Sequence, residues 1–334
     1  MGTIGSNIAA FFYEGGIFML EINEVNFPDE KFREYISDTF DENKKGYLTQ
    51  EELENVVYID VSLEYDIKSV KGIECFPNLT YLDCSRTGII NLDISHSSKL
   101  ERLWCTEPEI KELDLSNNPA LTLLDCSYTG ITSLDVSNNP ALVSLHCGGT
   151  GITQLDVSNN PELTSLNCED TGITSLDVSN NSKLETLDCS NTGITSLDVS
   201  NNLKLQHLYC TVTGITELDI SKNTALVYLI CSKTRITELD ISKNTELSIL
   251  NCFNTGLTNL DISNNTALET LWCDKTGITS LDVSNNSKLN VIGNRALSII
   301  KESDSIQDKI SQAKEVSENK QKDITEVKSQ ELER

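Results

Sequence analysis

Lysine and arginine are scarce in this chain, and their scarcity excludes one large class of partners. The 26 Lys and Arg residues face 51 Asp and Glu residues, which gives a formal net charge of −25. Nucleic-acid binding is not expected, because phosphate contacts are made mainly by Lys and Arg. A basic protein surface or a divalent cation suits this charge better.

Long apolar runs are also lacking. No stretch approaches the roughly 20 apolar residues that a membrane-spanning helix needs, so we expect no membrane span. Residues 1–21 are apolar in character, but Glu14 interrupts them, and they have neither a basic start nor a small-residue cleavage site. Such a segment is a poor signal peptide. We interpret it as a leader or an extension, which leaves export unresolved.

Closely spaced cysteine pairs are missing as well. None of the 11 cysteines forms a C-x-x-C pair, which removes the spacing expected of a zinc site. Ten of them instead lie 21 residues apart, namely Cys84, Cys105, Cys126, Cys147, Cys168, Cys189, Cys210, Cys231, Cys252 and Cys273. A spacing this regular indicates an internal repeat.

Residues 79–288 consist of ten consecutive 21-residue units, of which LETLDCSNTGITSLDVSNNLK at 184–204 is a clear copy. Counted from the first Leu, positions 1, 4 and 14 are Leu, position 6 is Cys, and position 11 is Ile except for Leu257. Apolar residues at 4 and 6 between variable residues at 3, 5 and 7 have the alternation of a short strand. Because one unit cannot bury its own apolar side, the units must stack around a shared core.

The fold predicted from this pattern is a leucine-rich-repeat solenoid with a parallel β-sheet on its concave face. A unit of 21 residues is too short for a strand and a full helix, so the convex side is expected to be extended or 3₁₀. The cysteines are expected to fill a narrow core, because an in-register parallel stack points all Cβ atoms the same way and disfavours disulfides. Glycine at position 10 is expected to supply a positive φ, so Glu109 and Arg235, which replace it, should mark altered turns.

An Asp at position 15 of every unit, from Asp93 to Asp282, forms a second ladder. A Ser follows each Asp two residues later, which indicates Asx turns in which the carboxylate accepts a backbone N–H. Calcium bound along this ladder is the alternative, although the glycine-rich nonapeptide of calcium-binding β-helices is absent.

Residues 22–78 read as a helix, a loop and a second helix, and we interpret them as a helical cap over the first repeat. The loop is EF-hand-like, but Lys45 stands at its fifth position, where calcium requires an oxygen ligand. We therefore expect no metal and no cofactor. A calcium site is the alternative, and its ligands would be Asp41, Asn43, Thr49 and Glu52.

The opposite end breaks the repeat. Residues 289–300 form a truncated last unit, in which Asn294 occupies the cysteine position. Residues 301–334 contain no Gly or Pro and place apolar residues at helical spacing, which predicts a charged helical tail. A helix that caps the solenoid, a weak coiled coil and a solvated tail are all compatible with this pattern.

The units resemble the leucine-rich repeats of bacterial internalins, in the 21-residue cysteine-ladder form found in internalin J. The shared motifs are L-x-x-L-x-C and the L-D-V-S return, and the resemblance covers residues 22–292. One departure lies at position 9, where this chain has Thr in nine of the ten units and the family usually has Asn. The resemblance implies a structural helical cap, a protein-binding role, and a place at the bacterial surface or outside the cell.

All seven aromatic residues between 79 and 288 fall at positions 3, 5, 7 or 8, which point outward from the predicted sheet. Exposed aromatics gathered on one face indicate recognition, although neighbouring rings can also stabilise a sheet. Together with adjacent His and Ile residues they define two candidate binding clusters. The first cluster is Tyr81, Trp104 and Tyr128, and the second is His207, Tyr209, Tyr228, Ile230, Ile249, Phe253 and Trp272.

No catalytic constellation is recognisable. His146 neighbours Cys147, but adjacent strand residues point to opposite faces. His207 and Asp188 would lie on adjacent strands, without a nucleophile or an oxyanion hole beside them. We therefore predict a non-enzymatic chain.

The function expected from the sequence is that of a monomeric, adhesin-like protein-binding module of a bacterial surface or secreted protein. Two alternatives stay open. In a carbohydrate-binding solenoid, Trp104, Tyr209 and Trp272 would stack on sugar rings. In a structural spacer, the concave face would bind nothing.

Overall fold

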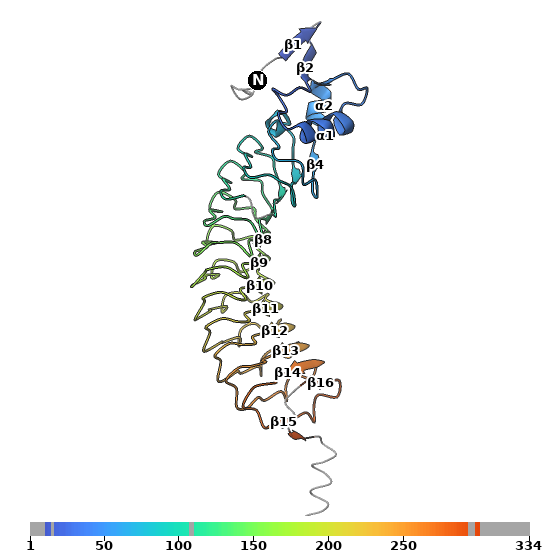
Figure 1. Cartoon of the computed structure of the whole chain (residues 1–334). Coiled ribbons are helices and arrows are strands. Elements are labelled where there is room, and N and C mark those ends of the chain that lie inside the picture. The colour runs from blue at the N-terminus through green and yellow to red at the C-terminus, as the bar shows by residue number, and fades with distance from the viewer. Residues whose placement is uncertain (1–10, 15–16, 107–109, 293–297, 301–334) are drawn as a thin grey trace, which may run out of the picture.

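The computed structural model describes residues 11–14, 17–106, 110–292 and 298–300, and these residues form a curved solenoid with a small cap at its N-terminal end (Figure 1). The leucine-rich-repeat architecture predicted from the 21-residue period is confirmed. The predicted charged helical tail, residues 301–334, lies outside the described residues, as do Glu109 and Asn294.

The cap combines two helices with a three-stranded antiparallel sheet, β1 (Phe11–Glu14), β2 (Ile17–Glu21) and β3 (Tyr47–Thr49). Helix α1 (Glu30–Phe40) begins where Asp29 accepts the N–H of Phe32, and α2 (Gln50–Asn55) begins with a capping box between Thr49 and Glu52. Such reciprocal bonds satisfy N–H groups that a helix start leaves without partners. Because β2 pairs with β3, residues 17–21 are joined to the cap.

The solenoid is built on one twelve-stranded sheet whose strands follow one another in register along the concave side (Figure 1). Each strand has three residues, and from β4 to β14 the central residue is buried. The strands are β4 (Tyr58–Asp60), β5 (Tyr81–Asp83), β6 (Arg102–Trp104), β7 (Leu123–Asp125), β8 (Ser144–His146), β9 (Ser165–Asn167), β10 (Thr186–Asp188), β11 (His207–Tyr209), β12 (Tyr228–Ile230), β13 (Ile249–Asn251), β14 (Thr270–Trp272) and β16 (Asn290–Ile292).

Strand β4 shows that the solenoid begins one turn before the ten regular units. Val61 donates its N–H to Asp83 at 2.9 Å, as Cys84 does to Trp104. Val61 therefore takes the cysteine position of a degenerate unit within the residues predicted to be cap. The signal is present in the sequence, because Val56, Ile59 and Val61 repeat the spacing of positions 1, 4 and 6.

The ten ladder cysteines are buried in the core, with at most 2% of each residue exposed. No disulfide joins cysteines in the described residues. Several thiols donate to the strand carbonyl of the next unit, as Cys147 does to Asn167 at 3.4 Å. Burial raises the pKa of the Cys126 thiol to about 12. The prediction that these cysteines fill the core is confirmed.

A ladder of buried asparagines at position 19 links each turn to the one before it. The side-chain N–H groups of Asn160 donate to the carbonyls of Val136 and Asn139 at 3.0 and 2.9 Å, and the same pair of bonds recurs from Asn118 to Asn286. These asparagines are at most 3% exposed. Sequence reasoning did not single out this position, although it keeps Asn223 and Asn244 where position 18 changes to Lys222 and Lys243.

Glycine at position 10 has a different role from the predicted one. Positive φ falls at position 8, for example at Tyr128 (61°) and Lys233 (55°). A Cβ on Gly193 would lie 3.0 Å from the methyl group of Thr174 in the preceding unit, so glycine is used here for close packing. Arg235 does not alter its turn, since its N–H donates to Ile215 at 2.9 Å as glycine does in neighbouring units. That prediction was wrong.

The convex side follows an extended and turn-rich path, as predicted, with a short parallel pair of β15 (Ser280–Asp282) and β17 (Ser298–Ile300) near its end. The position-15 carboxylates form the predicted Asx turns, in which Ser137 N–H donates to Asp135 at 2.9 Å. The Ser137 hydroxyl and N–H lower the pKa of Asp135. Within the described residues, no helix is both long and apolar enough to cross a membrane.

Replacing a buried asparagine should cost far more stability than replacing its exposed neighbour. Asn160→Ala removes two hydrogen bonds to backbone carbonyls. Each carbonyl still accepts one backbone N–H, so we expect the free energy of unfolding to fall by only about 2 kcal/mol. Asn159→Ala, the matched control, should change it by less than about 0.5 kcal/mol. Urea unfolding followed by circular dichroism measures both values, and equal losses would refute the ladder's role.

The ladder thiols should be inert while the chain is folded. The thiolate is the reactive species, and burial both hides the sulfur and suppresses its ionisation. We expect a disulfide-exchange reagent such as DTNB to label no ladder cysteine in the native chain. The half-buried Cys75 should react only slowly, because burial raises the pKa of its thiol to about 12, and all 11 cysteines should react after denaturation. Rapid labelling of ladder cysteines in the native chain would contradict the buried placement.

Candidate binding surface on the concave face

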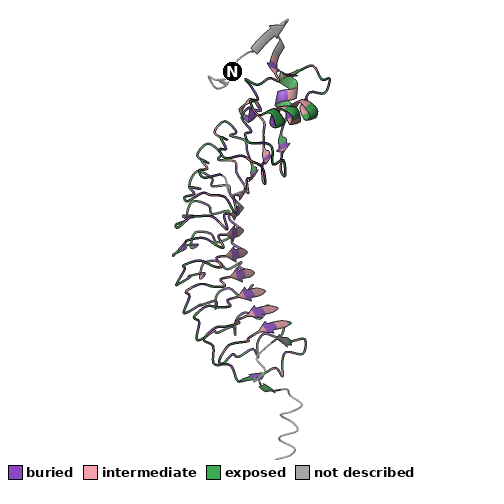
Figure 2. Cartoon of the chain, in the orientation of Figure 1, coloured by how far each residue is buried: buried purple, intermediate pink, exposed green. Residues whose placement is uncertain are grey.

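The outward strand positions form three parallel columns along the concave face. We call them columns 3, 5 and 7 after their positions in the unit, and Tyr58, Asp60 and Ser62 begin them in the degenerate first turn. Figure 2 shows the strands alternating between buried and half-buried residues on this side. In-register pairing places equivalent residues directly opposite one another, about 4.8 Å apart. Each column is therefore a continuous row of side chains.

The first predicted cluster is only partly brought together. The rings of Tyr81 and Trp104 lie 4.9 Å apart between centroids. Tyr58, which sequence reasoning missed because it precedes the regular units, stacks on Tyr81 at 4.2 Å and extends the row. Tyr128 lies apart at position 8, where it is 59% exposed and rests against the backbone of Gly149.

The second predicted cluster forms a broader apolar surface across β11 to β14. His207 and Tyr228 are ring neighbours at 4.9 Å, and Ile249 lies opposite Tyr228 in column 3. In column 5, Tyr209 lies opposite Ile230, whereas Asn251 separates Ile230 from Trp272.

Phe253 marks the edge of this second cluster in column 7. The ammonium group of Lys275 lies 5.2 Å from the centroid of the Phe253 ring, within the range of a cation–π contact. Desolvation, followed by the nearby charge of Asp188, raises the pKa of Tyr209. The apolar centre of the cluster is therefore bordered by charged groups, Lys275 beside Phe253 and Asp188 beside Tyr209.

The concave columns contain more acidic than basic residues, and the acids lie outside β11 to β13. From β4 to β14 their only basic residue is Arg102, and they contain no Lys. Their acids are Asp60, Asp83, Asp125, Glu169, Asp188 and Asp274. Between the two clusters, His146 lies 3.8 Å from Asp125 and within 3.2 Å of Ser144. The face thus combines aromatic rings with carboxylates.

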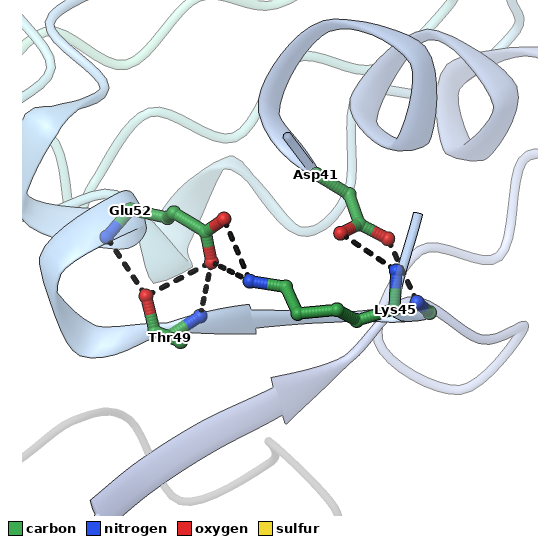
Figure 3. Close-up of polar contacts among 5 residues, drawn as sticks. Asp41, Lys45, Thr49 and Glu52 are labelled. Carbon is green, nitrogen blue, oxygen red and sulfur yellow. Dashed lines mark hydrogen bonds and ion pairs between the residues drawn. The ribbon is translucent and has the colours of Figure 1, made fainter. Parts of the chain in front are cut away.

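The cap loop, the other site considered, is held by a lysine (Figure 3). The Lys45 ammonium contacts both carboxylate oxygens of Glu52, at 2.8 and 2.9 Å, and Glu52 also accepts from Thr49. Asp41 accepts the backbone N–H groups of Lys45 and Gly46. Hydrogen bonds from Lys45 and Thr49 hold the pKa of Glu52 below its usual value, although burial opposes them.

Of the four alternative calcium ligands, Thr49 and Glu52 are hydrogen-bonded to each other. Asp41 instead accepts backbone N–H groups, and Asn43 is exposed. Lys45 supplies the positive charge beside Glu52. No group of three or more His, Cys, Asp or Glu suited to a metal ion occurs in the described part of the chain.

The residues considered for catalysis remain separate. Cys147 is fully buried, whereas the side chain of His146 is 40% exposed on the opposite face of the strand. His207 has its ring nitrogen Nδ1 3.2 Å from the Thr186 hydroxyl. A hollow of about 510 Å³ between Thr237 and Asn259 lies on the convex side, away from these residues.

Loss of the Lys45 ammonium should loosen the cap. The side chains of Lys45 and Glu52 are only 22% and 14% exposed, so their ion pair is shielded from water. We expect Lys45→Ala to cost about 1 kcal/mol and to speed hydrogen exchange of α1 amides about fivefold. Lys31→Ala, which removes the exposed pair with Glu34, should leave exchange unchanged. Equal exchange in both variants would contradict this role.

Comparison with protein-family models finds no match, and comparison with curated proteins finds none either. Among solved structures, the chain is similar to the functional domain of InlJ from Listeria monocytogenes, which includes a cysteine ladder, with 34% identity and a TM-score of 0.78. The match covers 84% of this chain and 61% of that one, so the chain spans less than two thirds of InlJ's domain.

Two further structures share the fold at lower identity. One is the internalin InlF from Listeria monocytogenes (22% identity, TM-score 0.65, covering 83% of this chain and 92% of that one). The other is a leucine-rich-repeat protein of Leptospira interrogans (21% identity, TM-score 0.62, covering 66% and 62%). The period, the buried cysteine ladder and these likenesses agree. The chain is a leucine-rich-repeat solenoid whose cysteine ladder is similar to that of the InlJ domain.

Proposed function

We propose that the chain is a non-catalytic protein-binding module that recognises its partner through the concave face. The observation that carries this proposal is the gathering of half-buried and exposed aromatic side chains in columns 3, 5 and 7, while the convex side repeats small polar residues. Trp and Tyr dominate the energetics of protein interfaces, because they bury a large area with little loss of side-chain freedom.

The second cluster is the proposed main anchor. Tyr209, Tyr228, Ile230, Ile249 and Trp272 are all half-buried on adjacent strands, with His207 and Phe253 at their edges. A partner that covers them would bury a contiguous apolar area surrounded by polar groups, which is the arrangement of a standard interface. Tyr81, Trp104 and Tyr128 supply a second point of contact on the same rigid sheet.

The internalin likeness favours a bacterial surface or secreted protein, and we place the module there, as a monomeric and adhesin-like protein. Carbohydrate binding is the competing proposal, because Trp104, Tyr209 and Trp272 all lie in column 5 and present their rings from one row. A spacer with no concave ligand is the third.

Removal of the main anchor should abolish binding. Alanine replacement of Tyr209, Phe253 and Trp272 together is expected to weaken binding to host-cell surface proteins at least tenfold, because two to three interface aromatics are lost. Tyr65→Ala, which removes a 65% exposed aromatic outside the concave face, is the control and should bind normally.

The same two variants on a glycan array separate the competing proposals. Loss of glycan binding with protein binding unchanged would favour the carbohydrate site. Unchanged binding on both would remove the concave-face hypothesis and leave the spacer.

A further inference from the structure

Trp104, which the protein-binding proposal uses only as part of a second point of contact, has surroundings of unusual composition. Trp104 lies in column 5 of β6, and its direct neighbours on the adjoining strands are Asp83 in β5 and Asp125 in β7. Trp104 is thus flanked in its column by an aspartate on each neighbouring strand, and neighbouring strands are about 4.8 Å apart.

The carboxylates are held in place by their own backbones. One oxygen of Asp83 accepts the N–H of Ser85 at 2.9 Å, and one oxygen of Asp125 accepts the N–H of Ser127 at 3.0 Å. The remaining oxygen of Asp125 lies 3.8 Å from His146, a contact that is charged only when the imidazole is protonated. The second oxygen of Asp83 thus makes no hydrogen bond to the described residues, whereas that of Asp125 faces His146.

Within the described residues, neither a Lys nor an Arg forms an ion pair with Asp83 or Asp125. Arg102 stands two residues before Trp104 on the same strand and is exposed, yet none of the ion pairs in the described residues joins it to Asp83 or Asp125. The ring of Trp104 is half-buried and supported on one side by Tyr81. A cation over an aromatic ring gains from the ring quadrupole, and nearby carboxylates add to that attraction.

We propose that Trp104, Asp83 and Asp125 form a subsite for an arginine or lysine side chain of a basic polypeptide partner. This inference rests on the proposed protein-binding function and names the charge of its partner. Charge complementarity supports it twice, because the concave columns hold six acids and one arginine and because the whole chain carries a net charge of −25. Charge complementarity of this kind guides encounter and rejects acidic partners.

The subsite can be tested by fluorescence, since Trp104 and Trp272 are the only two tryptophans. In the full-length Trp272→Phe variant, Trp104 is the only tryptophan that contributes to the fluorescence. We expect a short peptide that alternates arginine with serine to change its emission saturably, while matched glutamine–serine and glutamate–serine peptides do not. Raising the salt concentration should weaken the arginine peptide's binding.

Two double variants, each of which removes two negative charges, test whether the peptide depends on the acids beside Trp104. Asp83→Asn with Asp125→Asn should weaken the arginine peptide about tenfold, while Glu217→Gln with Glu238→Gln, an equal charge change on the exposed convex side, should weaken it less than twofold. Asparagine fits column 5 without disturbing the turn, because Asn167 and Asn251 already accept the N–H two residues later.

Equal weakening by both pairs would overturn the subsite, as would equal binding of the glutamine peptide or stronger binding of a neutral oligosaccharide such as cellohexaose. The outcome is independent of the main anchor. If the Tyr209, Phe253 and Trp272 alanine variant keeps its protein binding, the proposed function fails even where the arginine peptide still binds at Trp104.

Discussion

The stacked amide of the position-19 asparagine is the interaction on which the solenoid depends. A narrow repeat without a convex helix turns its backbone sharply and leaves carbonyls facing the interior, where an unpaired polar group is costly. Each asparagine donates to two such carbonyls of the preceding turn, for example Asn181 to Val157 and Asn160. These bonds form only when consecutive turns have the same length and the same register.

The fixed register explains the rest of the core. Cysteine at position 6 is small enough for the narrow interior, and its thiol can donate to the strand carbonyl of the next unit, as Cys168 does to Asp188. Threonine at position 9 closes its own turn by donating to the cysteine carbonyl, as Thr171 does to Cys168 at 2.7 Å. The chain thus pairs inward backbone carbonyls with short side chains, and the outward columns vary from unit to unit.

The period of the sequence predicted the solenoid, the concave sheet, the buried cysteines and the Asx turns, because each of these follows from which residues recur. It did not separate Asn159 from Asn160, although position 19 keeps Asn where position 18 has Lys222 or Lys243, because recurrence alone does not show which side chain the backbone turns inward. The role of glycine was mistaken for a similar reason: close packing against Thr174 and a positive φ both select glycine. Tyr58 was missed because its unit departs from the 21-residue length, although Val56, Ile59 and Val61 mark it.

Because the strands are parallel and in register, the distance between two residues of one column is set by the number of units between them. Trp104 and Tyr209 stand in the same column on β6 and β11, so gain or loss of one whole unit between them would change their separation by about 4.8 Å and leave both surroundings intact. Duplication and deletion of gene segments can therefore retune the spacing of two contact points without redesigning either. The repeat therefore sets the distance between two contact points in steps of one turn of the solenoid.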